Sequence, residues 1–485
     1  MKVARAAALV AAAWAFASLA WVVAHRVAYP FDLEWLEGAT LWHAERLADG
    51  LPLYPPPSLA FVPHPYPPLY PALIALLGRA CGGVSYALGR ALSTASFAGA
   101  LAIGWRFVRR ESGSRALATA AMAIPCAAYV AVGAWYDLVR VDSLWLLLTA
   151  AGTTLAWRAR RSTAGVAAAA LLLVAAFFTK QTAAPFMVAV AMALFVVERR
   201  AALLFVATLA LAGLPALWAM QRATGGWFWF YLFAVHHSHA FFPLAALRVP
   251  GRLALLLLPA VPLAAWALAR RRSPALLWTA WLAATGIAVS CLGKATAGGY
   301  TNAFIPGIYF SSLLVGVAAG ELLRDGERAT MAWALVAATI ALAPRVIPRA
   351  LQAVAPSLYA DPQTTGYALG ALVPTAEDRA REAALVARVR AVDGAVWLPT
   401  RPWYARLAGK TPLGGEMGAV DVTPTRVPIP GLDEALRSRR FAAVIVDEPY
   451  EPVLEPLFAR STVQAIDGAR LVAAPRRLRW WLTPR

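Results

Sequence analysis

The sequence predicts an all-α polytopic membrane domain of about eleven spans, followed by a small soluble α/β domain. Of the 485 residues, 60% are hydrophobic and 19 are tryptophan, and the mean hydropathy is +0.58. So few polar side chains cannot cover the surface of a water-soluble globule. From about residue 350 the apolar runs become short and the charges mixed. We therefore assign residues 1–348 to a transmembrane domain and residues 349–485 to a soluble domain.

Apolar runs long enough for a helix to approach or complete a membrane crossing define the first domain. The stretch 66–80 is also apolar, but a full span there would move every later arginine cluster to the other side of the membrane. We interpret it as an interfacial or re-entrant segment. The predicted spans are 6–24, 86–105, 116–134, 143–157, 164–178, 183–197, 201–219, 252–269, 274–292, 303–320 and 329–343.

The basic residues predict the orientation. The formal net charge is +19, but most arginines before residue 345 lie in short clusters between apolar runs. This pattern is typical of topology signals in cytoplasmic loops, not of a nucleic-acid-binding surface. We expect a bacterial cytoplasmic membrane protein with a cytoplasmic N-terminus and an extracytoplasmic C-terminal domain, and no nucleic-acid partner. The first span also fits a signal peptide, but no small-residue cleavage site precedes His25.

In the C-terminal part, two short apolar runs, 395–398 and 441–446, predict strands, and 375–392 predicts a helix. No Walker loop, GxSxG motif or Rossmann glycine pattern occurs there. An acceptor-binding role and a purely structural role both stay open for this domain.

Potential metal ligands are few. The cysteines, Cys81, Cys126 and Cys291, lack metal-binding or disulfide spacing. The histidines at 236, 237 and 239 follow a run of aromatic residues, which favours an aromatic belt at the membrane interface over a metal site. No metal ligand is assigned, although the acids of the first outer loop would suit Mg²⁺ or Mn²⁺.

Three acids follow the first span, in the outer loop 25–65: Asp32, Glu34 and Glu37. Carboxylates at the rim of a bilayer are poorly solvated, which favours a task such as proton abstraction or cation binding. Glu34 and Glu37 are three residues apart and would share a face if this stretch is helical. A solvated loop without function is the alternative.

The residues after these acids carry a resemblance. Glu37-Gly38 precedes a helical stretch with an Ala-x-x-Leu pattern, then Gly50-x-x-x-Tyr54, then Tyr66-Pro-Pro-Leu-Tyr70 ahead of an apolar run. This order resembles the opening of GT-C-type membrane glycosyltransferases. They include protein O-mannosyltransferases, lipid A aminoarabinose transferases and family-39-like bacterial enzymes. The resemblance covers roughly the first 320 residues.

The resemblance implies a sugar donor on a polyprenyl phosphate and an acid of the first outer loop as the base. Glu37 falls at the matching position, but Leu36 stands where the family usually has Asp. Asp32 and Glu34 therefore stay open as alternatives for the base. His64 and Tyr66, at the beginning of this Pro/Tyr motif, are assigned to substrate binding.

A second outer segment, 136–142, carries Asp137, Arg140 and Asp142. By the resemblance, one of the aspartates is a second acid and Arg140 grips a phosphate or carboxylate, because a guanidinium can make two parallel hydrogen bonds to an oxyanion. The alternative is an internal Arg–Asp pair that fixes helix ends.

Lysines are rare in this chain, which has only four, and two of them fall at outer turns: Lys180 and Lys294. Both positions resemble those where GT-C chains carry a lysine near the lipid phosphate, where an ammonium can neutralise a leaving group. Snorkelling towards the interface is the alternative. Asn302, after Gly298-Gly299, resembles part of a motif that follows the second lysine in such chains.

These features together predict an inverting glycosyltransferase that moves a sugar from a polyprenyl-phosphate carrier to an acceptor hydroxyl at the outer membrane face. The acceptor is a lipid, a glycan or a protein. A transporter or flippase of a lipid-linked or anionic solute and a non-catalytic assembly protein are the alternatives.

Overall fold

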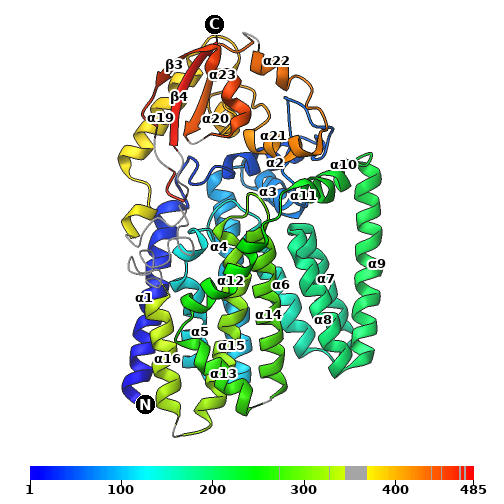
Figure 1. Cartoon of the computed structure of the whole chain (residues 1–485), viewed down its shortest axis with the longest axis vertical. Coiled ribbons are helices and arrows are strands. Elements are labelled where there is room, and N and C mark those ends of the chain that lie inside the picture. Colours follow the sequence, from blue (N-terminus) through cyan, green and yellow to red (C-terminus); the bar gives the residue numbers. More distant parts are fainter. Residues whose placement is uncertain are drawn as a thin grey trace.

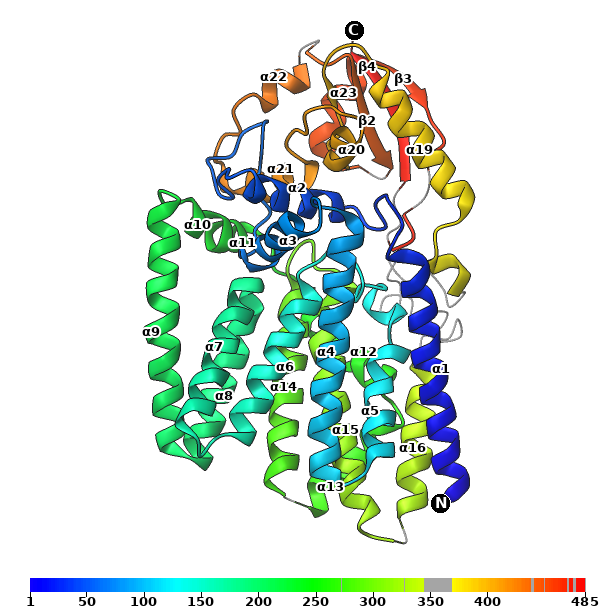
Figure 2. The same ribbon diagram turned by 180° about the vertical axis from the view of Figure 1, so that it is seen from behind.

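A computed structural model describes residues 1–271, 273–326, 328–343, 369–437, 440–448, 450–468, 471–473 and 477–484. Long helices run side by side in a bundle, and a smaller domain with a sheet sits at one end of it (Figure 1). The N-terminus lies at the opposite end of the bundle, as the reverse view also shows (Figure 2). The predicted combination of a helical domain and a small α/β domain is thus confirmed. The predicted boundary at residue 348 lies outside the described residues.

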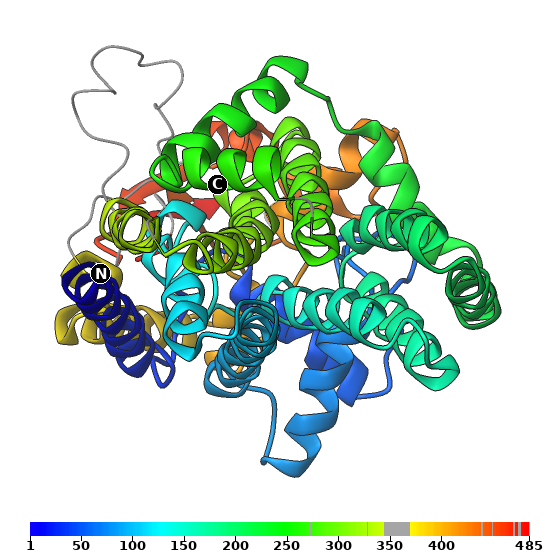
Figure 3. The same cartoon turned by 90° about the horizontal axis from the view of Figure 1, so that it is seen from below.

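The bundle helices follow the predicted apolar runs closely. Serine hydroxyls cap several of them by accepting a hydrogen bond from a first-turn amide, for example Ser85 from Leu88 and Ser162 from Gly165. The view along the bundle shows the helices packed side by side (Figure 3). They are α1 (Lys2–Arg26), α4 (Tyr86–Ser112), α5 (Arg115–Ala127), α6 (Asp142–Arg158), α7 (Thr163–Thr179), α8 (Ala184–Val197), α9 (Arg199–Ala223), α12 (Pro243–Leu256), α13 (Ala260–Arg270), α14 (Pro274–Ala295), α15 (Ile305–Leu323) and α16 (Ala329–Leu342).

Five spans among the described residues are long and apolar enough to cross a membrane: α1, α4, α9, α14 and Thr301–Leu323. The pair α12 and α13 makes a sixth if the two helices count as one span. These helices indicate a multi-pass membrane protein, while the predicted number of eleven spans stays a prediction.

Two of the predicted spans differ in shape from the structure. A single straight helix over 252–269 is wrong, because α12 and α13 are bent by 96° relative to each other. Pro259 lies at this break; proline lacks an amide hydrogen and disfavours a helical residue before it. The run predicted over 116–134 is helical only to Ala127, and a short 3-10 turn, Val130–Val132, follows.

Two short helices, α2 (Glu37–Ala48) and α3 (Leu69–Ala80), lie between the bundle and the smaller domain (Figures 1 and 2). With 12 residues, α3 is about 18 Å long, too short for the roughly 30 Å hydrocarbon core. Its length fits the interfacial interpretation of this segment.

The smaller domain contains a four-stranded sheet in the order β1-β2-β4-β3, in which β1 pairs parallel with β2 and the other pairs are antiparallel. Strand β2 overlaps the predicted apolar run 441–446 from residue 443 onward, and Val444, Ile445 and Val446 are all buried in it. Strands β3 and β4 had not been predicted. The elements are α19 (Ala376–Arg390), β1 (Val396–Trp397), α20 (Pro402–Leu407), α21 (Glu416–Val422), α22 (Leu432–Arg437), β2 (Ala443–Glu448), α23 (Glu455–Ala459), β3 (Ser461–Ala465) and β4 (Arg477–Pro484).

The smaller domain is tied to α2 and to the segment that follows it. Arg406 of α20 forms an ion pair with Glu45 of α2 at 2.8 Å. The backbone of Leu59 accepts a hydrogen bond from the Gly414 amide at 2.6 Å and donates one to the Pro430 carbonyl at 2.9 Å. These contacts hold α20 and α21 over the end of the bundle.

Close packing at Gly38 makes this junction sensitive to a single methyl group. A Cβ at Gly38 would meet the Cβ of Trp403 at 2.6 Å and Oδ1 of Asp32 at 3.0 Å. We expect Gly38→Ala to lower the stability by about 1–3 kcal/mol, because α20 must move to make room. The thermal midpoint in detergent measures this. Gly251→Ala is the matched control, because a Cβ there meets nothing within 4 Å; an equal midpoint for both variants would contradict this packing.

Candidate functional site

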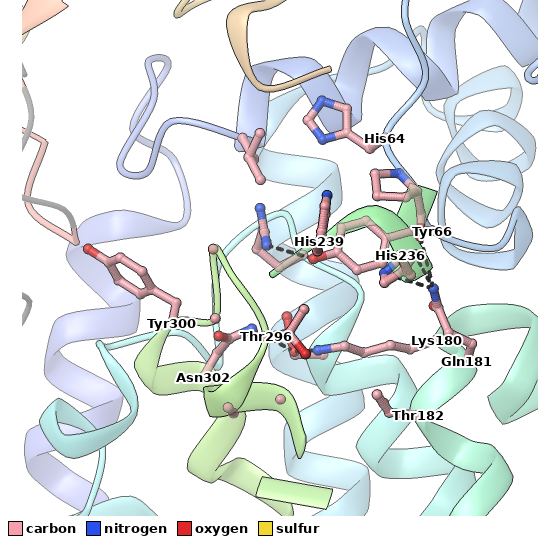
Figure 4. Close-up of a pocket in the computed structure, with 18 of the residues that line it drawn as sticks. His64, Tyr66, Lys180, Gln181, Thr182, His236, His239, Thr296, Tyr300 and Asn302 are labelled. Carbon is pink, nitrogen blue, oxygen red and sulfur yellow. Dashed lines mark hydrogen bonds and ion pairs between the residues drawn. The ribbon is translucent and has the colours of Figure 1, made fainter. Parts of the chain in front are cut away.

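A cavity of about 260 Å³ lies where the bundle meets the smaller domain. Its wall comes from segments far apart in the sequence: the loop before α2, the Pro/Tyr motif, the start of α6, the turn between α7 and α8, the end of α14 and helix α21. Figure 4 shows side chains from these segments pointing toward one another. Among the predicted site residues, the cavity wall includes His64, Tyr66, Arg140, Asp142, Lys180 and Asn302.

Asp142, the first residue of α6, organises the side of the cavity nearer the bundle. Its Oδ1 lies 2.7 Å from Nζ of Lys180 and accepts a hydrogen bond from the Asn302 amide at 3.1 Å. The indole of Trp135 donates to Oδ2 at 3.1 Å. The ammonium of Lys180 is therefore held in place at the cavity wall, where it can meet an anion (Figure 4).

Arg140 brings a second positive charge to the cavity. Its Nη1 lies 3.5 Å from Oε2 of Glu34, and its Nη2 lies 3.5 Å from the Tyr66 hydroxyl. The guanidinium also stands over the ring of Trp135, 5.0 Å from the centroid. Two cations from different helix ends thus face one hollow, an arrangement suited to phosphate.

Three aromatic rings form another part of the wall. Trp35 and Trp135 meet edge to face with centroids 6.2 Å apart, and Tyr300 lies 4.9 Å from Trp35 and 5.1 Å from Trp135. Aromatic faces beside hydrogen-bonding groups are common in pockets for small polar ligands.

The side of the cavity nearer the smaller domain is formed by histidines and by residues of α21. His236 contacts the Gln181 amide at 3.1 Å. His239 lies 3.3 Å from Oδ1 of Asp421, and this hydrogen bond raises the pKa of His239. Met417 also lines the wall, so the smaller domain completes the cavity.

His64 is held through its backbone. Its amide donates to Nε2 of His43 at 2.9 Å, while Nδ1 of His43 contacts the Ala39 carbonyl at 2.5 Å. Burial lowers the pKa of His43 to about 4 and that of His64 well below its ordinary value. Both rings are therefore neutral at physiological pH.

Glu34 has the features of a proton acceptor. It is fully buried and does not itself line the cavity, whose wall includes the nearby Trp35 and Leu36. Burial raises the pKa of Glu34 to about 7 although Arg140 lowers it. Its Oε2 accepts a hydrogen bond from the Leu36 amide at 3.1 Å. Its Oε1 has no hydrogen-bond partner within the part of the chain that the structure describes. A carboxylate with a free oxygen and a pKa near neutrality suits general base catalysis.

Glu37 is engaged in a structural pair instead. Arg90 grips it with two hydrogen bonds, from Nε at 2.9 Å and from Nη2 at 2.6 Å. The amides of Leu33 and Val139 donate to it at 2.7 and 2.9 Å. Burial alone would raise the pKa of Glu37, but Arg90 and these amides hold it below its ordinary value. The geometry favours Glu34 over Glu37 as the base; this assignment stays a prediction.

Asp32 differs from both glutamates. Its Oδ1 accepts hydrogen bonds from the Gly38 amide at 2.8 Å and the Tyr86 hydroxyl at 2.9 Å. Burial raises the pKa of Asp32 well above its usual range. A raised pKa favours the protonated form of Asp32, which cannot accept a proton.

Five predicted site residues do not line the cavity: Asp137, Lys294 and the three acids of the first loop. Asp137 pairs with Arg26 of α1 at 3.1 Å and accepts a hydrogen bond from the Tyr129 hydroxyl at 2.6 Å, so it joins α1 to the second outer segment. Lys294 directs its ammonium to the Gly299 carbonyl at 3.1 Å.

A divalent cation finds no evident ligand set. Among the described residues, no three His, Cys, Asp or Glu side chains are grouped so that they could hold a metal ion. The acids of the first loop are instead bonded to arginines, amides or hydroxyls.

Sequence reasoning missed several wall residues. His236 and His239 had been interpreted as part of an aromatic belt, whereas both line the cavity. Trp35 had been used only as the neighbour of the acids. Asp421 and Met417 carry no sequence signal, because only the packing of the two domains brings them to the site.

No protein-family model matches the chain, and no curated protein has a significantly similar sequence. The fold is nevertheless that of GT-C-type proteins, as the sequence resemblance had implied. The structure of ArnT from Cupriavidus metallidurans in the apo state has a TM-score of 0.59 over 96% of this chain and 97% of that chain, at 15% identity. ArnT bound to undecaprenyl phosphate has a TM-score of 0.56 over 97% of both chains, at 14% identity. At these identities the likeness establishes the fold alone.

Proposed function

We propose that the chain is an inverting glycosyltransferase that takes its sugar from a polyprenyl phosphate and transfers it to an acceptor hydroxyl. One observation supports this most: Lys180, Arg140, Asn302 and Asp142 meet in one cavity, and Glu34 lies 3.5 Å from Arg140. The fold it shares with ArnT, which binds undecaprenyl phosphate, adds support. The cavity then faces the outside of a bacterial cytoplasmic membrane, as the arginine clusters indicate.

In this mechanism the Glu34 carboxylate accepts the proton of the acceptor hydroxyl at Oε1. The acceptor oxygen forms a bond to the anomeric carbon while the bond from that carbon to the phosphate oxygen breaks. The electron pair of the broken bond leaves with the polyprenyl phosphate, whose charge Lys180 and Arg140 stabilise. Attack from the side opposite the leaving group inverts the anomeric configuration. The ring faces of Trp35, Trp135 and Tyr300 are placed to hold the sugar.

Binding of undecaprenyl phosphate to the purified chain tests the first half of this proposal. We expect Lys180→Gln to weaken the affinity about ten- to a hundredfold, because a hydrogen bond between charged groups is worth about 1.5–3 kcal/mol. A thermal-shift titration in detergent measures the affinity. Lys294→Gln is the matched control, since that ammonium lies at the end of α14 and does not line the cavity. Equal affinity in both variants, or an equal loss in both, would count against a phosphate at Lys180.

A further inference from the structure

A second cavity, entirely apolar, lies between α7, α8 and α9. It has a volume of about 310 Å³, and every residue that lines it is apolar. The three helices stand side by side at one edge of the bundle (Figures 1 and 2). We refer to this cavity as the α7–α9 groove.

The α7–α9 groove adjoins the polar cavity along the chain. Phe177 and Phe178, at the end of α7, line the groove, and so do Ala184 and Met187, at the start of α8. The turn between them carries Lys180, Gln181 and Thr182, which line the polar cavity. One short turn therefore has the cationic site on one side and the apolar groove on the other.

The groove extends from this turn down into the bundle. Its wall on α9 runs from Leu217 to Val206, about 16 Å at the rise of an α-helix. This is about half of the hydrocarbon thickness of a bilayer. The length suits part of a long alkyl chain whose polar end stays at Lys180.

Helix α9 stands at the edge of the bundle, so most of its surface is not covered by other parts of the chain (Figure 1). Only 6% of its most apolar stretch is buried, against 89% for the span Thr301–Leu323. Gly213 of α9 faces the groove, and a Cβ built there meets nothing nearer than Cγ2 of Val174 at 3.9 Å. A larger side chain at this position would fill the groove without displacing backbone.

We propose that the α7–α9 groove holds the proximal part of the polyprenyl chain while the phosphate lies at Lys180. This rests on the proposed function, since it takes a polyprenyl phosphate as the ligand. An amphiphile with an anionic head and an apolar tail matches the charge of the turn and the chemistry of the groove at once. Dispersion and burial of apolar surface then add affinity in proportion to the chain length that enters.

A larger apolar cavity, of about 600 Å³, lies between α1, α5 and α16 and provides an internal control. Trp14, Cys126 and Ile340 are among its lining residues, and neither Lys180 nor Arg140 is. Helices α1 and α16 stand at the edge of the bundle opposite α9 (Figure 1). The proposal expects the polyprenyl chain to avoid this cavity.

The experiment compares two ligands that share a phosphate but differ in chain length, undecaprenyl phosphate and dimethylallyl phosphate, in thermal-shift titrations of the full chain. We expect Gly213→Phe to weaken undecaprenyl phosphate about tenfold or more, because two buried CH₂ groups already account for about that factor. Dimethylallyl phosphate should lose much less, because its single prenyl unit is too short to reach Gly213 from Lys180. Ala11→Phe, which fills the control cavity, should change neither affinity.

Each other outcome overturns the proposal in a recognisable way. If Gly213→Phe weakens both ligands equally, it disturbs the phosphate site instead of a chain site. If Gly213→Phe changes neither affinity, or if Ala11→Phe has the larger effect, the polyprenyl chain lies elsewhere. The proposed binding of the lipid phosphate at Lys180 is not affected by that result. If the unmodified protein binds neither ligand, the proposed function fails as well.

Discussion

Replacing Glu34 by glutamine is expected to reduce sugar transfer about 10²- to 10⁴-fold, the usual contribution of a general base. The amide has nearly the shape of the carboxylate and can still accept the hydrogen bond from Leu36, but it cannot take a proton. Binding of undecaprenyl phosphate should change little, because Glu34 is not among the residues that line the cavity. Transfer is measured as radiolabelled sugar released from the lipid carrier into an acceptor extract.

The same assignment predicts a pH profile. Burial raises the pKa of Glu34 to about 7. Because the ionised form accepts the proton, transfer should rise with pH, reach half of its maximum near pH 7 and then level off. In Glu34→Gln the residual activity should lose this rise.

Asp32→Asn is the matched control for Glu34→Gln. Asp32 is also buried in the same loop, its raised pKa favours the protonated form, and asparagine retains the carbonyl oxygen to which Gly38 and Tyr86 donate hydrogen bonds. It should lose far less activity. If Asp32→Asn were as inactive as Glu34→Gln, with both proteins folded, the choice between these acids would be wrong.

Much of the helical domain could be predicted because the sequence signal of a membrane span is local. Each apolar run and its flanking arginines lie within one stretch of sequence, so α6, α7, α8 and α14 begin and end within a few residues of the prediction. The bend between α12 and α13 escaped this reasoning. The run is apolar throughout, and only Pro259 marks the place where the chain turns by 96°.

Site residues could be predicted where a residue type is rare in the chain. They could not be predicted where their role depends on how the helices pack. Lys180 was conspicuous because lysines are so few, and its partners Asp142 and Asn302 stood in polar outer segments. Lys294 looked equivalent, but successive residues of a helix point about 100° apart. Gly293 faces the cavity, so its neighbour does not.

The sequence could not distinguish the three acids of the first loop from one another. Spacing places Glu34 and Glu37 close together, yet their environments are set by Arg90 and Arg140, which lie more than 50 and more than 100 residues away in the chain. Which carboxylate becomes a structural anchor and which keeps a free oxygen is decided only when those helices meet.

Replacing Glu37 by glutamine is therefore expected to destabilise the protein, by about 3–5 kcal/mol, because it leaves the guanidinium of Arg90 buried without a countercharge. Arg90 also donates to the carbonyls of Arg26 and Phe31, so its displacement would release the chain between α1 and α2. The measurement is the thermal midpoint in detergent together with the yield of monodisperse protein.

A second variant separates this structural role from catalysis. Glu37→Gln combined with Arg90→Gln removes both buried charges, and because neither partner is then left uncompensated, part of the lost stability should return. A purely catalytic Glu37 predicts the reverse pattern: a single variant with the midpoint of the unmodified protein and no transfer, and a double variant that is less stable. That result would restore Glu37 as the base and leave Glu34 as its neighbour, whereas recovery in the double variant assigns Glu37 to the architecture that holds Glu34 beside the cavity.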